Sequence, residues 1–146
     1  MALLSWSDQY LIGHTTIDAE HRELFRLIND FHSRWSEGHQ RQEIGQVLNR
    51  LVQYAELHFQ HEEGIMAAAG YPQLATHKQA HERLYETIYT LHRDYAEQGR
   101  RLEQDTMKFV KNWLVEHILN NDYAFRDFLA RRKAAGEAAS GETAAE

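Results

Sequence analysis

The sequence predicts an all-α protein, and specifically an up-down-up-down antiparallel four-helix bundle. The chain contains a single proline, Pro72, and its glycines fall mainly between long stretches in which apolar residues recur every three or four positions. This spacing places apolar side chains along one face of a helix. Because the connections between the stretches are short, consecutive helices should pack against one another in antiparallel order.

Four helices are expected, with additional segments at both ends of the chain. An N-terminal arm, residues 1–17, carries enough apolar side chains to lie across the bundle, and a short C-terminal helix should follow the fourth helix. The last residues have almost nothing to bury, so we expect residues 1–130 to form one domain and residues 131–146 a disordered tail. The predicted helices run from about Asp18 to Trp35, from about Arg41 to Ala68, from near Pro72 until Gly99, and from about Leu102 to Asn121.

Composition limits the classes of function. The formal net charge is −6 and no run of basic residues could follow a phosphate backbone, which argues against nucleic acid as a partner. No segment approaches the about 20 apolar residues of a membrane span, and the N-terminus lacks a signal-peptide pattern, so we expect a cytoplasmic protein. With no cysteine, any metal must be held by nitrogen and oxygen donors.

The 10 histidines are the main compositional excess, and several lie on inward stripes. Residues four apart share a helix face, so His58 with Glu62, and His77 with His81, form two pairs that can each hold a metal. His21 and His117 interrupt the apolar stripes of the first and fourth helices. Single buried histidines are usually hydrogen-bonded core residues, but a joint pattern over four helices predicts a metal centre.

Asp122 is the least regular member of this pattern. It follows His117 by five residues, which on a regular helix places it roughly 140° away from the same face. Asn120 and Asn121 precede it. We expect the helix to fray or to form a π-type turn here, which would bring the carboxylate inward.

The order His, His-x3-Glu, His-x3-His and His-x4-Asp resembles the hemerythrin family, and specifically the bacterial single-domain hemerythrins. The resemblance extends from about Trp6 to Phe128, and each family ligand position holds the expected residue type. Its segments read IDAEHREL, HFQHEEGIM, GYPQLATHKQAH and WLVEHILNND. The resemblance implies a non-haem di-iron centre with an oxo or hydroxo bridge, in which His77, His81 and His117 hold one iron, His21 and His58 hold the other, and Glu62 and Asp122 bridge them.

The resemblance also implies a function. Two irons preferring about six ligands each offer about twelve positions, of which the histidines, two bridging carboxylates and a shared bridge fill all but one. That open position falls on the two-histidine iron and would bind dioxygen reversibly, for storage, transport or delivery to an oxygen-consuming enzyme. Family positions around it are apolar and would exclude water. They are Leu24, Trp113, Leu114 and Ile118.

We expect a monomeric oxygen-binding protein rather than an enzyme, and three alternatives remain open. A di-iron oxidase or peroxidase is the nearest, but such bundles usually use four carboxylates. A zinc hydrolase is suggested by His77 and His81, yet Lys78, Gln79 and Ala80 between them supply no general base. Oxygen, nitric-oxide or iron sensing or scavenging would use the same ligands.

Five histidines have no assigned role. Of these, His61 is expected at the surface or next to a ligand residue, outside the cluster. The five are His14, His32, His39, His61 and His92.

Overall fold

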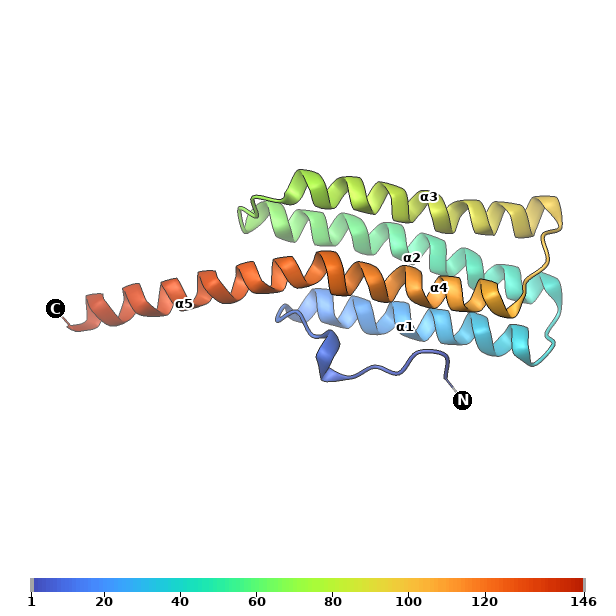
Figure 1. The fold of residues 1–146 in the computed structure, drawn as a ribbon, viewed down its shortest axis with the longest axis horizontal. Coiled ribbons are helices and arrows are strands. Elements are labelled where there is room, and N and C mark those ends of the chain that lie inside the picture. Colours follow the sequence, from blue (N-terminus) through green and yellow to red (C-terminus); the bar gives the residue numbers. More distant parts are fainter. Residues whose placement is uncertain (1, 146) are drawn as a thin grey trace.

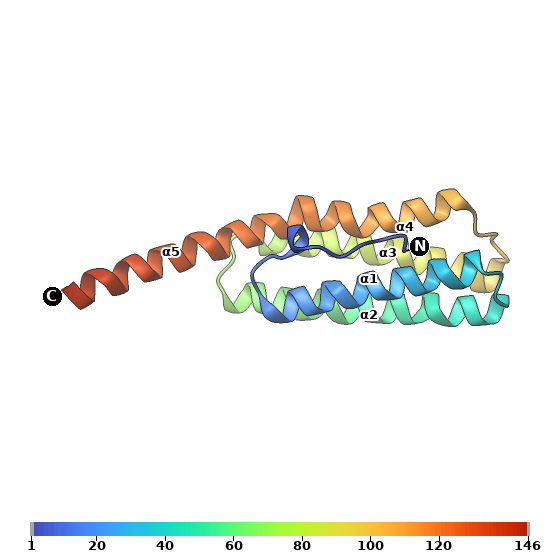
Figure 2. The ribbon, with the colours of Figure 1, turned by 90° about the horizontal axis from the view of Figure 1, so that it is seen from below.

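The computed structural model describes residues 2–145, with side chains through residue 136, and every regular element in that range is helical. The helices α1 to α4 lie side by side, each antiparallel to the next (Figures 1 and 2). The predicted fold class is therefore confirmed, with helix ends within a few residues of the expected positions. The helices are α1 (Thr15–Ser36), α2 (Arg41–Ala68), α3 (Leu74–Gln98) and α4 (Gln104–His117).

Hydrogen bonds of two side chains define the start of α1. His14 caps α1, because its Nδ1 accepts a hydrogen bond from the Ile17 N–H at 3.4 Å. The Asp18 carboxylate instead accepts from the backbone N–H of Ile12 at 2.8 Å. The acidic residue at the start of α1 thus fixes the incoming chain rather than the first turn of the helix.

The N-terminal arm lies along the bundle, as expected. It contains a short 3₁₀ helix, η1 (Asp8–Tyr10), and in Figure 2 it runs over the seam between α1 and α4. The Asn29 side chain forms two hydrogen bonds with the backbone of Leu4, each 2.8 Å long. The Trp6 and Tyr10 rings pack edge-on against Phe25. These contacts cover the apolar side of α1 and keep the arm in place.

The C-terminal segment differs from the prediction of a short helix followed by a disordered tail. A π-helical segment, η2 (Ile118–Asp122), continues α4 directly into α5 (Tyr123–Ala145), which extends beyond the bundle in Figure 1. Alanine is the commonest residue in this stretch and has the highest helix propensity, which favours a helix even though residues 132–136 are exposed. A domain boundary at residue 130 remains a prediction.

The bundle interior is divided along its length. The end near the α1–α2 and α3–α4 connections is apolar and closely packed, whereas the end near α5 contains all the deeply buried histidines. A second, smaller apolar cluster lies below the histidines at the base of α5. Apolar side chains therefore enclose the polar region from both ends. The smaller cluster comprises Ile12, Ile17, Met66, Tyr71 and Phe125.

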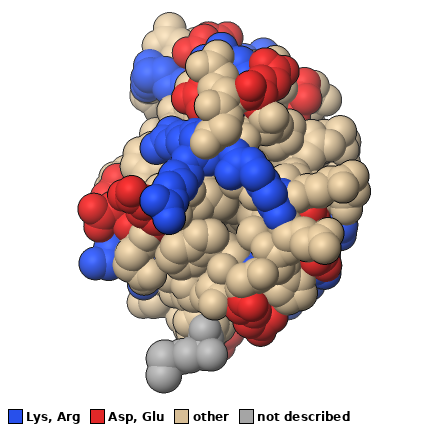
Figure 3. Space-filling model, turned by 90° about the vertical axis from the view of Figure 1, so that its right-hand side faces the viewer, with Lys and Arg blue, Asp and Glu red and all other residues tan. Residues whose placement is uncertain are grey.

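The surface carries charges of both signs. Figure 3 views the end of the bundle opposite α5 and shows basic and acidic side chains next to one another. Arg34, on this end, pairs with Asp30 at 2.8 Å and with Glu43. None of the described helices is both long enough and apolar enough to cross a membrane.

Candidate metal centre

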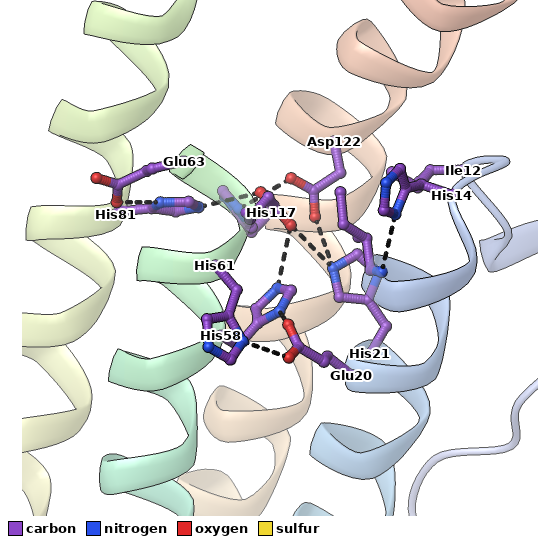
Figure 4. Close-up of polar contacts among 12 residues, drawn as sticks. Ile12, His14, Glu20, His21, His58, His61, Glu63, His81, His117 and Asp122 are labelled. Carbon is purple, nitrogen blue, oxygen red and sulfur yellow. Dashed lines mark hydrogen bonds and ion pairs between the residues drawn. The ribbon is translucent and has the colours of Figure 1, made fainter. Parts of the chain in front are cut away.

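The seven predicted ligand residues meet in one place in the interior. His21 comes from α1, His58 and Glu62 from α2, and the remaining four from α3, α4 and η2 (Figure 4). Each residue is at most 5% exposed. Their donor atoms form two groups that share Glu62, and within each group the atoms lie within 4.8 Å of one another. The groups are Glu62, His77, His81, His117 and Asp122, and His21, His58 and Glu62.

The η2 segment explains how Asp122 reaches this cluster. The N–H of Tyr123 donates to the carbonyl of Ile118, five residues earlier, as the π-helical pattern requires. One extra residue per turn brings position i+5 nearly onto the face of position i. Asp122 is consequently fully buried and its Oδ1 lies 3.2 Å from His117 Nε2. Of the two expected alternatives, fraying and a π-type turn, the structure has the π-type turn.

Glu62 lies between two sets of imidazoles, with one carboxylate oxygen facing each. Its Oε1 lies 2.6 Å from His77 Nε2 and 3.2 Å from His81 Nε2. Its Oε2 lies 3.1 Å from His58 Nε2 and 3.3 Å from His21 Nε2. The two oxygens thus separate the α3 histidines from those of α1 and α2.

Asp122 divides its oxygens in the same way. Its Oδ1 lies 3.2 Å from both His77 Nε2 and His117 Nε2, while its Oδ2 lies 3.1 Å from His21 Nε2. Together the two carboxylates define a three-histidine side, consisting of His77, His81 and His117, and a two-histidine side, consisting of His21 and His58. A carboxylate with one oxygen on each side has the arrangement needed to bridge two metal ions.

The donor set fits a pair of metal ions because the cluster does not satisfy its own polar atoms. Glu62 Oε2 and both Asp122 oxygens have no hydrogen-bond partner among the described residues, and neither do the Nε2 atoms of four of the histidines. Each buried unsatisfied group costs about 1–3 kcal/mol. Two donors about 2.1 Å from one octahedral metal lie about 3 Å apart, close to most of the separations here. The four nitrogens belong to His21, His58, His81 and His117.

Without metal, protons balance the charge of the cluster. Burial lowers the pKa of His21, but Asp122 and Glu62 more than offset it and raise this pKa to about 10. The same competition raises the pKa of His77 to about 9. Burial raises the pKa of Glu62, but its close contacts with the surrounding histidines bring this pKa well below its usual range. The geometry therefore favours ionised carboxylates next to positive charge, which metal ions also provide.

Two further carboxylates contact ligand imidazoles at Nδ1, the ring nitrogen that does not face the cluster. Glu20 Oε1 lies 2.9 Å from His58 Nδ1, and Glu63 Oε2 lies 2.8 Å from His81 Nδ1. Sequence reasoning missed both glutamates. Each directly adjoins a ligand position, so its side chain leaves the helix about 100° away from the cluster. Only the packing of a neighbouring helix brings a histidine ring within its reach.

The predicted oxygen-pocket residues are all buried in the larger apolar cluster. Leu24, Leu114 and Ile118 are at most 1% exposed, and Trp113 is 7% exposed. Phe59, which the sequence did not single out, joins them and stacks on the His81 ring at a centroid distance of 4.2 Å. Trp113 and His117 also line a surface hollow of about 510 Å³ between α3 and α4.

Comparison with known proteins identifies the family. A family model described as the Hemerythrin HHE cation binding domain matches residues 13–135. The chain belongs to the hemerythrin family. The resemblance seen in the sequence is thereby confirmed, and the non-haem di-iron centre and the oxygen-binding function expected from it are those of this family.

Relatives match along most of the chain. A bacteriohemerythrin from Stenotrophomonas maltophilia is 34% identical, over 87% of this chain and 82% of the relative. One from Methylococcus capsulatus is also 34% identical, over 81% of this chain and 90% of the relative. The crystal structure of a wild-type hemerythrin superposes with a TM-score of 0.79 at 31% identity, covering 86% of this chain and 97% of that one.

Proposed function

We propose that this hemerythrin binds dioxygen reversibly, with His77, His81 and His117 holding one iron, His21 and His58 the other, and Glu62 and Asp122 bridging them. The observation that carries the proposal is the division of both carboxylates between the three-histidine and two-histidine sides. Two ferrous ions supply the electrons for reversible binding of dioxygen. The residues supply geometry, charge and exclusion of water.

The two sides differ in how many protein donors they offer. His77, His81 and His117 provide three nitrogens on one side, against two from His21 and His58 on the other. With the bridging oxygens shared equally, the two-histidine side has fewer protein donors. We propose that the exogenous ligand binds on this side. His21 and His58, at 0% and 1% exposure, are well shielded from bulk solvent there.

The apolar residues around the centre favour binding over further reaction. Leu24, Leu114 and Ile118 carry no titratable proton, and the Trp113 Nε1–H is occupied as a donor to the Leu84 carbonyl at 3.0 Å. A bound oxygen molecule would therefore meet few groups able to protonate it, and water would be excluded. We propose that these four residues form the oxygen pocket and slow oxidation of the iron.

We propose a binding protein rather than an enzyme, because five imidazoles and only two carboxylates surround the centre. Carboxylate-rich bundle sites are the ones that typically activate oxygen. Delivery to an oxygen-consuming enzyme, a monomeric state and a cytoplasmic location remain predictions. The monomer is supported by the distribution of large exposed apolar side chains, which lie one to an element: Leu57, Tyr89, Phe109 and Leu119.

Repeated oxygenation of the iron-loaded protein tests the proposal. Anaerobically reduced protein exposed to air should develop a visible charge-transfer band, lose it on deoxygenation and regain it over several cycles. Zinc-loaded protein is the matched colourless control. Irreversible bleaching with turnover of a reductant would contradict the proposal in favour of an oxidase or peroxidase, and hydrolytic activity of the zinc form would favour a hydrolase.

A further inference from the structure

Glu20 joins a buried ligand histidine to a surface histidine. Its Oε1 lies 2.9 Å from Nδ1 of His58, and its Oε2 lies 2.6 Å from Nδ1 of His61. The side chains of His58, Glu20 and His61 are 1%, 12% and 46% exposed, so the three groups lead from the interior to solvent. Figure 4 shows them together at the α1–α2 interface, with Glu20 reaching from α1.

The second contact of Glu20 limits how its carboxylate can turn. A carboxylate bonded through a single oxygen can rotate about its terminal bond and exchange one oxygen for the other. His61 occupies Oε2 and so leaves Oε1 aimed at His58. Because His58 and His61 lie three residues apart on α2, they share a helix face and can hold the carboxylate from both sides.

The other ligand histidines lack such an arrangement. His81 has one carboxylate behind it, that of Glu63. Nδ1 of His21 and Nδ1 of His117 have no hydrogen-bond partner among the described residues. His58 is therefore the ligand of the two-histidine side whose ring orientation is fixed from outside the cluster, with its Nε2 held 3.1 Å from Glu62 Oε2.

We propose that His61 is a positioning residue which, through Glu20, orients His58 and strengthens it as an electron donor to the metal. The proposal rests on the di-iron centre proposed above. An N–H group that donates to a carboxylate makes the opposite nitrogen of the imidazole a better donor, and such partners typically change metal affinity by about 10–100-fold. Stronger donation stabilises the ferric state and so lowers the midpoint potential of the centre. His61 would thus tune the side on which oxygen binds.

Four variants of the iron-loaded protein test this role: Glu20→Gln, His61→Ala, His61→Gln, and His92→Ala as a matched control for loss of a histidine far from the centre. The midpoint potential and the rate of iron loss to a chelator are measured, together with the melting temperature. We expect Glu20→Gln to raise the potential and to speed iron loss about tenfold or more. His61→Ala should also raise the potential and speed iron loss, but to a smaller extent. His61→Gln should have values close to those of the parent protein, because its amide still donates a hydrogen bond to Glu20. His92→Ala should match the parent protein.

The outcomes separate this proposal from the oxygen-binding proposal. If His61→Ala matches His92→Ala while Glu20→Gln is altered, Glu20 acts alone and His61 has no positioning role. Failure of His61→Gln to recover the parent values would likewise overturn the proposal. Both results are read from potential and iron retention, so they hold whether or not the parent protein shows reversible oxygenation. Because His61 is half-exposed, the metal-free forms of all His61 variants are expected to have equal melting temperatures.

Discussion

The two ends of the bundle are built on opposite principles. The end far from α5 is filled by apolar side chains that complement one another, such as Phe31, Leu48 and Met107, each fully buried. The end near α5 buries five imidazoles and two carboxylates, many of whose polar atoms have no hydrogen-bond partner among the described residues. Burial of apolar surface stabilises the first end by itself. The second end gains its stability from what it binds, so function and local stability are coupled there.

Truncation of Glu62 should have the largest effect and should act on only one end. Glu62→Ala removes both oxygens that face the two histidine sides, so we expect loss of most of the iron and of the visible band. Metal analysis and absorption spectra measure this. Glu56→Ala, at an exposed position on the same helix, is the matched control and should retain both. Retention of full iron by Glu62→Ala would show that the carboxylate does not bridge.

Truncation at the apolar end should have the reverse pattern. Phe31→Ala removes a fully buried ring and should lower the free energy of unfolding by about 3–5 kcal/mol through loss of burial and creation of a cavity. At a temperature where this variant remains folded, its iron content and visible band should equal those of the parent. Chemical denaturation and spectroscopy test both statements. A changed spectrum in the folded variant would mean that the two ends are not separable.

The metal-free protein should lose stability in mild alkali. The pKa values of His21 and His77 are raised from the ordinary 6.5 to about 10 and about 9. A histidine whose pKa is raised in the folded state stabilises the protein fully at pH values below its unfolded-state pKa. This stabilisation is lost as the pH rises through the folded-state pKa. Melting temperatures of chelator-stripped protein should therefore fall between about pH 6.5 and pH 10, and less so for metal-loaded protein, whose nitrogens are occupied. A flat profile for the stripped protein would contradict this.

The smallest expected effect concerns the boundary between the two ends. Ile118→Val removes one methylene from a fully buried residue of the proposed oxygen pocket, at a cost of about 0.5–1.5 kcal/mol. We expect unchanged iron content but faster oxidation of the reduced protein, because the pocket excludes water less completely. Val52→Ala, in the apolar core on α2, is a control for packing loss alone. Equal oxidation rates in the two variants would show that Ile118 is not part of the oxygen pocket.

The sequence was sufficient to predict the bundle and the residues that meet in its core. Apolar spacing determines which helix faces turn inward, and His58 with Glu62 or His77 with His81 can be read as pairs because they are one turn apart. Even the irregular position of Asp122 predicted that the helix frays or forms a π-type turn, since only a local change in helix geometry brings a residue five positions after His117 to the same face.

Features that depend on contacts between helices or on solvent were not predicted. Glu20 and Glu63 point away from the cluster on their own helices, and only the approach of α2 to α1 and of α3 to α2 gives them histidine partners. At the start of α1, the Asp18 carboxylate accepts a hydrogen bond from the N-terminal arm, and His14 caps the helix. The residues beyond 130 have few apolar side chains to bury, which predicted a disordered tail. Their helix propensity instead favours a helical backbone.

An anomalous-diffraction map at the iron absorption edge, from crystals of the iron-loaded protein, tests the central claim most directly. We expect one peak beside His77, His81 and His117, a second beside His21 and His58, and Glu62 and Asp122 between them. A single peak, or a pair of peaks that the two carboxylates do not bridge, would contradict the proposed centre.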